Sequence, residues 1–270
     1  MKHLNQLIME KKKNNFSILV LTDFSESSRI ALRNAAKFAK LVNGSVGAYH
    51  VRSLQALSEE ENQVSLSRRR RDQHVETHAV AEEMLSRIAE DEGVDIQFSM
   101  DFGNVKNCVM NKVNTAHPDL LILGKRKSKI LNLLGDRLTQ FVIENCNTSL
   151  LISSSHSELH SFSDLSLGFY GETIEKSDLN IIDHLQETTS PIKYFGIRSQ
   201  SVEVDTIDEP KKKDRSFIFS QEGEKAVEAL TSYVSRTNTQ LFCIPKKDNS
   251  DPQPVMQMVN RIDVPILIYK

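Results

Sequence analysis

Residues 121–136, LILGKRKSKILNLLGD, combine features that suit the binding of a phosphate group. An apolar run ends at Gly124, and a second glycine, Gly135, stands just before Asp136. Glycine lets a backbone approach a phosphate closely, and lysine or arginine attracts it by charge. The cations between the glycines are Lys125, Arg126, Lys127 and Lys129. A solvated basic turn explains the same cations without a ligand, and we favour it while keeping both interpretations open.

Polar residues also follow two earlier apolar runs. Asp23 and Ser25 come directly after residues 16–22, and Arg52 follows residues 45–51. A carboxylate at position 23 can accept hydrogen bonds from a sugar or a base. Asp or Ser at this point is also the usual N-cap of a following helix. Capping is the better explanation for either residue taken alone.

The elements that must position these residues alternate between short apolar runs and longer amphipathic stretches. Apolar runs at 16–22, 45–51, 94–100, 118–124 and 148–153 predict buried strands, and helical spacing predicts helices at 25–44, 74–93, 104–116 and 134–146. This alternation is typical of a mostly parallel sheet covered on both faces. In such sheets ligands bind at the carboxyl ends of the strands. The residues after each strand are therefore expected to share one edge.

The same order of elements returns after a polar stretch at 155–163. Strands are predicted at 165–171, 192–199, 215–221, 239–245 and 264–270, and helices at 177–189, 224–237 and 254–262. We therefore predict an α/β fold of two tandem five-stranded, mostly parallel sheets with helices on both faces, in the Rossmann-like manner. The expected domains are residues 1–154 and a degenerate repeat at 155–270.

Composition narrows the classes of function. The chain has 270 residues, 39% of them hydrophobic, and a net charge of -2. Nucleic-acid binding is not expected, since such proteins usually carry a basic excess. Without an apolar run of 18 residues or an N-terminal signal, we expect a cytoplasmic protein with no membrane span. Cys108, Cys146 and Cys243 lack ligand spacing and suit reduced, buried thiols.

Two further clusters have side chains that could form a site. Arg68–Arg71 can face an acidic partner, but acidic residues lie just upstream and favour a solvated helix end or loop. His74 and His78 have the i, i+4 spacing of metal ligands on a helix. With no third ligand in view, no metal site is expected.

Three stretches of the first half resemble the universal stress protein family. They are ILVLTDFSESSRIALRNAAKFAK from residue 18, GAYHV from residue 47, and HPDLLILGKRK…LLGDRLTQFVIENCNTSLLI from residue 117. The resemblance covers roughly residues 16–154. It implies a five-stranded α/β domain, pairing of two such domains through their last strands and, in one branch of the family, ATP at the strand ends.

That ATP-binding branch holds phosphates and ribose with glycine, two residues, glycine, nine residues, glycine, then Ser or Thr. Gly124 matches the first glycine and Gly135 the last. The middle glycine falls on Lys127, whose Cβ obstructs close backbone approach, and the following spacer has seven residues. Asp136 replaces the hydroxyl residue and puts a negative charge where a helix N-terminus would favour an anion. Ordinary ATP binding is therefore not the leading expectation.

Other positions of the family pattern are kept. Leu21, Asp23 and Val51 match the adenine and ribose positions, and Arg126 matches a position that often contacts the nucleotide. Leu123 completes the expected pocket. The resemblance thus implies a base end that persists without its phosphate end.

The second half lacks these positions. Residues 170–173 read YGET where the first half has TDFS, and residues 244–257, IPKKDNSDPQPVMQ, contain no glycine. Proline stiffens this loop and removes backbone donors. We expect the second half to be a structural partner rather than a second site.

Three functions are weighed. The first is a non-catalytic stress-response or regulatory protein that binds an unidentified protein partner, its two domains forming an intramolecular pseudo-dimer. The alternative is a module that binds ATP or another adenine nucleotide in the first-half pocket. The third, an enzyme such as a nucleotidyl transferase, lacks a sequence motif for a nucleophile, an acid–base pair or a metal. Whether the chain also forms a homodimer is left open.

Overall fold

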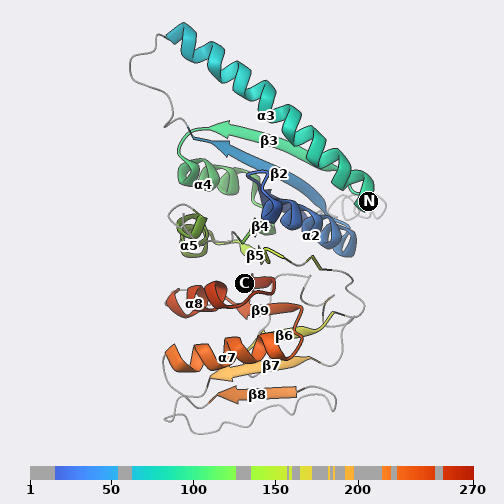
Figure 1. The fold of residues 1–270 in the computed structure, drawn as a ribbon, viewed down its shortest axis with the longest axis vertical. Coiled ribbons are helices and arrows are strands. Elements are labelled where there is room, and N and C mark those ends of the chain that lie inside the picture. Colours follow the sequence, from blue (N-terminus) through green and yellow to red (C-terminus); the bar gives the residue numbers. More distant parts are fainter. Residues whose placement is uncertain are drawn as a thin grey trace, which may run out of the picture.

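Ten strands form one continuous sheet in the computed structural model, in the order β3-β2-β1-β4-β5-β10-β9-β6-β7-β8 (Figure 1). The predicted α/β class with a mostly parallel sheet is confirmed. The structure differs from the prediction in one respect: the two expected five-stranded sheets are joined into one ten-stranded sheet. The structure describes residues 16–53, 63–125, 135–156, 158–159, 165–171, 182, 185, 192–197, 215–219, 224–246 and 252–270.

The first five strands are parallel to one another, with β1 between β2 and β4. Each lies within two residues of its predicted bounds; the central strands β1, β4 and β5 are continuous apolar runs buried on both faces. The strands are β1 (Ser17–Leu21), β2 (Ser45–Arg52), β3 (Ile96–Phe102), β4 (Leu120–Gly124) and β5 (Ser149–Ser153). Their shared direction brings the chain after β1, β2 and β4 to one edge of the sheet.

Among the described residues of this half, four helices cover the sheet. They are α2 (Glu26–Val42), α3 (Gln63–Glu92), α4 (Val105–Ala116) and α5 (Gly135–Asn145). Ser25 is the N-cap of α2 and accepts from the Ser28 N–H at 3.4 Å, as the capping interpretation expected. Asn43 ends the helix in the left-handed conformation.

Helix α3 differs most from its prediction. It begins at Gln63 rather than near residue 74, and Arg68–Arg71 lie inside it with exposed side chains. The apolar spacing of residues 74–93 predicts a buried face of Val75, Ala79, Met84, Leu85 and Ile88; this is wrong for Val75, which is 63% exposed, and for Ala79, which is also exposed. Between residues 67 and 92, the buried residues of α3 are Thr77, Ala81, Leu85 and Ile88. No helix in the described ranges is long and apolar enough to cross a membrane.

The second half repeats the strand order of the first. Its strands are β6 (Leu167–Tyr170), β7 (Lys193–Ile197), β8 (Arg215–Phe219), β9 (Leu241–Pro245) and β10 (Ile266–Tyr269), and its fully described helices are α7 (Glu224–Arg236) and α8 (Gln253–Arg261). The helix predicted at 177–189 lies outside the described residues except for Ile182 and Leu185, which are helical and buried. Within this half the strands are again parallel.

The two halves meet where β5 and β10 pair in antiparallel fashion (Figure 1). Leu151 is opposite Leu267 at the centre of this seam, and both side chains are fully buried. The seam thus lies in the middle of the sheet.

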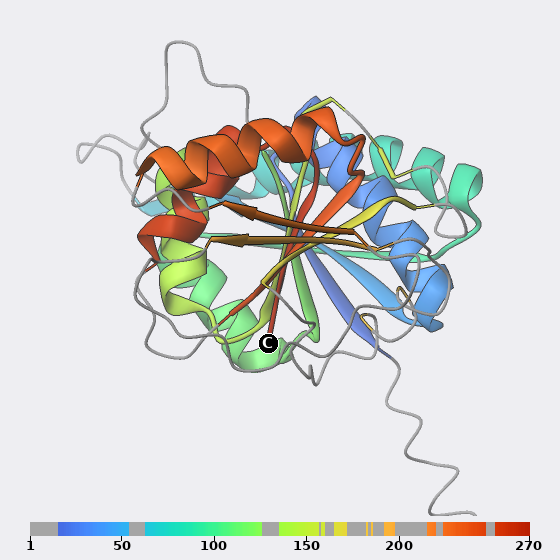
Figure 2. The same ribbon diagram turned by 90° about the horizontal axis from the view of Figure 1, so that it is seen from below.

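Each face of the sheet carries a core that runs through both halves. One core unites α2 and α3 with Phe169 and Tyr269 of the second half. The other unites α4, α5, α7 and α8, which lie on the opposite side of the twisted sheet (Figure 2). Because apolar burial is shared across the seam, the halves are expected to stabilise each other.

Buried polar bonds also fix the chain where it leaves the first half. The Asn34 carboxamide donates to Ser153 Oγ at 3.1 Å, and its oxygen accepts from the Leu159 N–H at 2.9 Å. Lys37 Nζ lies 3.2 Å from a Glu158 carboxylate oxygen. Helix α2 therefore holds both the end of β5 and the segment after it.

Candidate functional site

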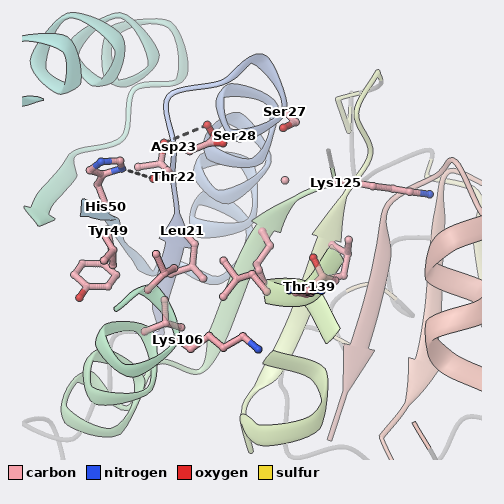
Figure 3. Close-up of a pocket in the computed structure, with 18 of the residues that line it drawn as sticks. Leu21, Thr22, Asp23, Ser27, Ser28, Tyr49, His50, Lys106, Lys125 and Thr139 are labelled. Carbon is pink, nitrogen blue, oxygen red and sulfur yellow. Dashed lines mark hydrogen bonds between the residues drawn. The ribbon is translucent and has the colours of Figure 1, made fainter. Parts of the chain in front are cut away.

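A cavity of about 730 Å³ opens at the carboxyl ends of β1, β2 and β4 (Figure 3). Its wall comes from the first turn of α2, from α4 and α5, and from the last turn of α8. Its apolar side chains are Leu21, Val51, Val105, Val109, Leu123, Leu138, Ile152 and Val259. Polar residues line the rest, so the cavity has an apolar wall beside several hydrogen-bonding groups.

The turn after β1 presents Asp23 at the cavity. Asp23 Oδ1 accepts from the Ser25 N–H at 3.1 Å and from the Ser25 hydroxyl at 2.5 Å. The next residue, Phe24, has a φ of 62°, and its N–H donates to Thr22 Oγ1 at 3.1 Å. These bonds give the exposed Asp23 carboxylate a set orientation.

His50 lies behind this turn and lines the cavity beside it (Figure 3). Its Nδ1 is 2.8 Å from the Thr22 carbonyl oxygen, which can only accept, so Nδ1 carries the proton. The Phe24 ring lies against the imidazole with centroids 4.7 Å apart. Burial lowers the pKa of His50, which favours the neutral ring.

Tyr49 forms part of the wall from β2. Its hydroxyl donates to Asp101 Oδ2 at 2.7 Å and lies 3.3 Å from the Cys108 carbonyl oxygen. Burial, followed by the hydrogen bond to Asp101, raises the pKa of Tyr49, so the phenol stays protonated. Tyr49 is a fixed wall residue rather than an acid or base.

Gly124 is required by packing as well as by any ligand. A Cβ at this position would lie 2.5 Å from the Ser27 carbonyl oxygen and 2.9 Å from the Ser28 N. The end of β4 and the first turn of α2 touch at this point. The presence of glycine here is thus explained without a phosphate.

Lys125 also lines the cavity, but its ammonium group binds elsewhere. Nζ donates to the Ile262 carbonyl oxygen at 2.7 Å and lies 3.4 Å from the Asn260 carbonyl oxygen, at the C-terminal end of α8. Its side chain points away from the cavity, toward the second half (Figure 3). Lys125 is only 20% exposed, so the favoured interpretation of a solvated cation is wrong for this residue.

Two cations missed by the sequence analysis line the cavity from helix starts. Lys106 is in the first turn of α4, and its Nζ lies 4.8 Å from the centre of the Phe141 ring of α5. Arg137 is in the first turn of α5 and is exposed. Neither residue directly follows a strand, so a prediction based on the residues at strand ends did not include them. A search of first helical turns for cations would have found them.

The predicted site residues fall into two groups. Leu21, Asp23, Val51, Leu123 and Gly124 come together around the cavity. Of the others, Gly135 and Asp136 form the start of α5, and the structure does not describe their side chains; Arg126, Lys127 and Lys129 lie outside the described residues.

The described His and Cys residues form neither a metal site nor a disulfide. No group of three or more His, Cys, Asp and Glu residues in the described part of the chain could hold a metal ion. His74 and His78 pack ring against ring, with centroids 4.3 Å apart. The three cysteines are free; Cys146 and Cys243 are buried, whereas Cys108 is only partly buried.

Taken together, the fold and the cavity define a doubly wound α/β protein with a ligand-sized hollow at its strand ends. The model of the universal stress protein family matches residues 15–154, which is half of the chain. This chain belongs to the universal stress protein family.

Solved structures share this architecture over nearly the whole chain. A universal stress protein from Archaeoglobus fulgidus DSM 4304 is similar, with a TM-score of 0.71, 14% identity, and coverage of 95% of this chain and 99% of its own. A functionally unknown protein from Pseudomonas aeruginosa PAO1 has a TM-score of 0.55 and 9% identity and covers 95% of this chain and 93% of its own. At these identities the likeness shows the fold. A search of curated proteins found no match.

Proposed function

We propose that this universal stress protein is a non-catalytic regulatory protein of the cytoplasm, and that its first-half cavity binds an adenine nucleoside or nucleotide. The observation that carries the proposal is the cavity itself. It lies at the carboxyl ends of the strands, where ligands bind in sheets of this type. Its volume of about 730 Å³ is within the range typical of small-molecule sites, about 300–1,000 Å³.

The base and ribose are the parts of the ligand that the cavity suits best. Leu21, Val51 and Leu123 offer an apolar surface to a planar base. Asp23 provides carboxylate oxygens, which accept hydrogen bonds from ribose hydroxyls. The turn around Ser25 orients this carboxylate before any ligand arrives, so little side-chain freedom is lost on binding.

The phosphates are expected to add little affinity. The ammonium group of Lys125 already binds carbonyl groups of α8, and the sequence from Gly124 to Asp136 departs from the family's phosphate pattern at Lys127 and in its spacer. Lys106 remains at the cavity, over the Phe141 ring. We therefore expect adenosine and AMP to bind with similar affinity and ATP to gain no large advantage.

We propose that the protein regulates by binding a protein partner, and that this partner binds helix α3. Its outer part extends beyond the sheet at the edge of the molecule (Figure 1). That part carries Arg68–Arg71 and the 63% exposed Val75. Exposed basic and apolar side chains on one helix suit an acidic protein surface.

We also propose that residues 1–154 and 155–270 are two domains of one pseudo-dimer, the second being structural. The shared strand order and the antiparallel β5–β10 seam support this division. Because the terminal strands are paired inside one chain, a homodimer would have to use another surface. Size measurement in solution tests this point.

Calorimetric titration tests the binding proposal. Adenosine, AMP, ADP, ATP and cyclic AMP are titrated into the full chain, and into Asp23→Ala. Asp95→Ala removes an exposed carboxylate that does not line the cavity and is the matched control. We expect binding that is lost or weakened at least tenfold in Asp23→Ala only; no heat with any ligand would rule the proposal out. A phosphate-release assay with ATP should show no turnover.

A further inference from the structure

The cavity of the first half is not built by the first half alone. Val259 and Asn260, in the last turn of α8, line it together with residues from β1, β2 and β4. Val259 is buried, whereas the Asn260 side chain is exposed. The second half thus brings a residue with a carboxamide side chain to the rim of the site.

Lys125 holds this turn of α8 in place. Its ammonium group donates to the Ile262 carbonyl oxygen at 2.7 Å, lies 3.4 Å from the Asn260 carbonyl oxygen and is 3.8 Å from the Asp263 carboxylate. The last carbonyls of a helix have no partners within the helix, and a cation near them is stabilising. Lys125 therefore joins the end of β4 to the end of α8 across the seam.

The same link occurs once more, in the reverse direction. Lys246 follows β9 as Lys125 follows β4, and its ammonium group donates to the carbonyl oxygens of Ile143 at 2.9 Å and Cys146 at 2.5 Å, at the end of α5. The backbone N–H groups of the two lysines also correspond, because they donate to Ser153 and Tyr269 of the neighbouring terminal strands. Lys246 does not line the cavity. The two links are equivalent in structure, but only Lys125 lines the cavity.

We propose that the second half supplies a ligand-contacting residue, Asn260, and that Lys125 is the positioning residue that fixes it. A carboxamide has two N–H donors and one acceptor oxygen, so it can bond a ribose hydroxyl, which adenosine and AMP share. This inference rests on the proposed binding of an adenine nucleoside or nucleotide. It makes the degenerate half a part of the site rather than only a support.

Adenosine and AMP titrations of four variants test the inference: Asn260→Ala, Lys125→Met, their double variant, and Lys246→Met as the matched control. We expect Asn260→Ala and Lys125→Met each to weaken AMP binding by about three- to tenfold, the effect of one hydrogen bond. The double variant should bind no more weakly than Asn260→Ala. Lys246→Met should bind as the wild type does, although it loses an equivalent cross-seam link.

Other outcomes would overturn the inference in recognisable ways. A Lys125→Met effect on AMP but not on adenosine would mean that Lys125 binds the phosphate directly. Equal weakening in Lys246→Met would mean that any loosening of the seam impairs the site. Unchanged binding in Asn260→Ala would remove the second half from the site. Absence of binding in the wild type would instead overturn the proposed function, and this inference with it.

Discussion

The two halves of this chain have the same strand order but different residues at the ends of their strands. After β1 stands a hydrogen-bonded turn that presents Asp23, and β4 ends at Gly124, which packs against α2. The corresponding strands of the second half end at Tyr170 and Pro245. The lysine that follows β4 or β9 is the same in both halves and reaches across the seam in both. The strand order and the cross-seam lysine link are thus duplicated, whereas the polar turn after β1 and the glycine at the end of β4 are not.

The largest effect on stability is expected at the β5–β10 seam, where the two halves share a buried core. Leu267→Ala should lower the free energy of unfolding by about 2–5 kcal/mol, because it leaves a cavity beside Leu151 at the β5–β10 pairing. Urea unfolding followed by circular dichroism measures this. Both halves should unfold in one transition. Two separate transitions in the wild type would show that the halves are independent.

A second effect tests whether Gly124 is present for packing. Gly124→Ala should lower the free energy of unfolding by about 1–3 kcal/mol, since the added Cβ meets the backbone of Ser27 at 2.5 Å. Gly47→Ala is the control, because a Cβ there would come no closer than 3.6 Å to Leu19. Equal stability of the two variants would mean that this glycine is kept for another reason.

The polar tie between the halves should have a similar or slightly smaller effect. Asn34→Ala deprives the buried Leu159 N–H of its acceptor and should cost about 1–3 kcal/mol in unfolding free energy. Ser153→Ala removes the other partner of Asn34 and leaves that N–H bonded, so it should cost less. The reverse ranking in denaturant midpoints would contradict this role of Asn34.

The smallest effect concerns pH. Burial lowers the pKa of His50 below the unfolded value, so between those two values the unfolded chain binds more protons. Stability should therefore fall as pH drops below about 6.5, the ordinary pKa of histidine. Arg52 and Asp23 are the charged groups that act on this ring. His50→Gln should flatten the pH dependence of the unfolding midpoint between pH 7.5 and 5.5; an unchanged slope would assign it to other groups.

Much of the fold could be predicted from the sequence because its central strands are buried on both faces. Runs such as ILVL and LLILG clearly predict buried strands, and the first-half strands were predicted within two residues of their bounds. Helix α3 was misjudged because residues 63–73 are polar and show no apolar period. Residues 67–72 of this helix are exposed, so no buried apolar stripe marks this part of it in the sequence.

The site was predictable only where it follows the strands. Asp23 and Val51 were found because parallel strands bring their carboxyl ends together. Asn260 could not be found in this way, because it reaches the cavity from the other half of the chain. Lys125 was found for the wrong reason, as its charge suggested phosphate or solvent and its partners are carbonyl groups of α8. Contacts across the seam leave no local signal in sequence.

The number of ligands bound per chain tests most directly the claim that one of two equivalent scaffolds carries a site. Equilibrium dialysis of the full chain against labelled adenosine, carried to saturation, gives this number. We predict one adenosine per chain, lost in Asp23→Ala. Two per chain would show that the second half also binds, and none at saturating concentrations would show that the cavity is not an adenosine site.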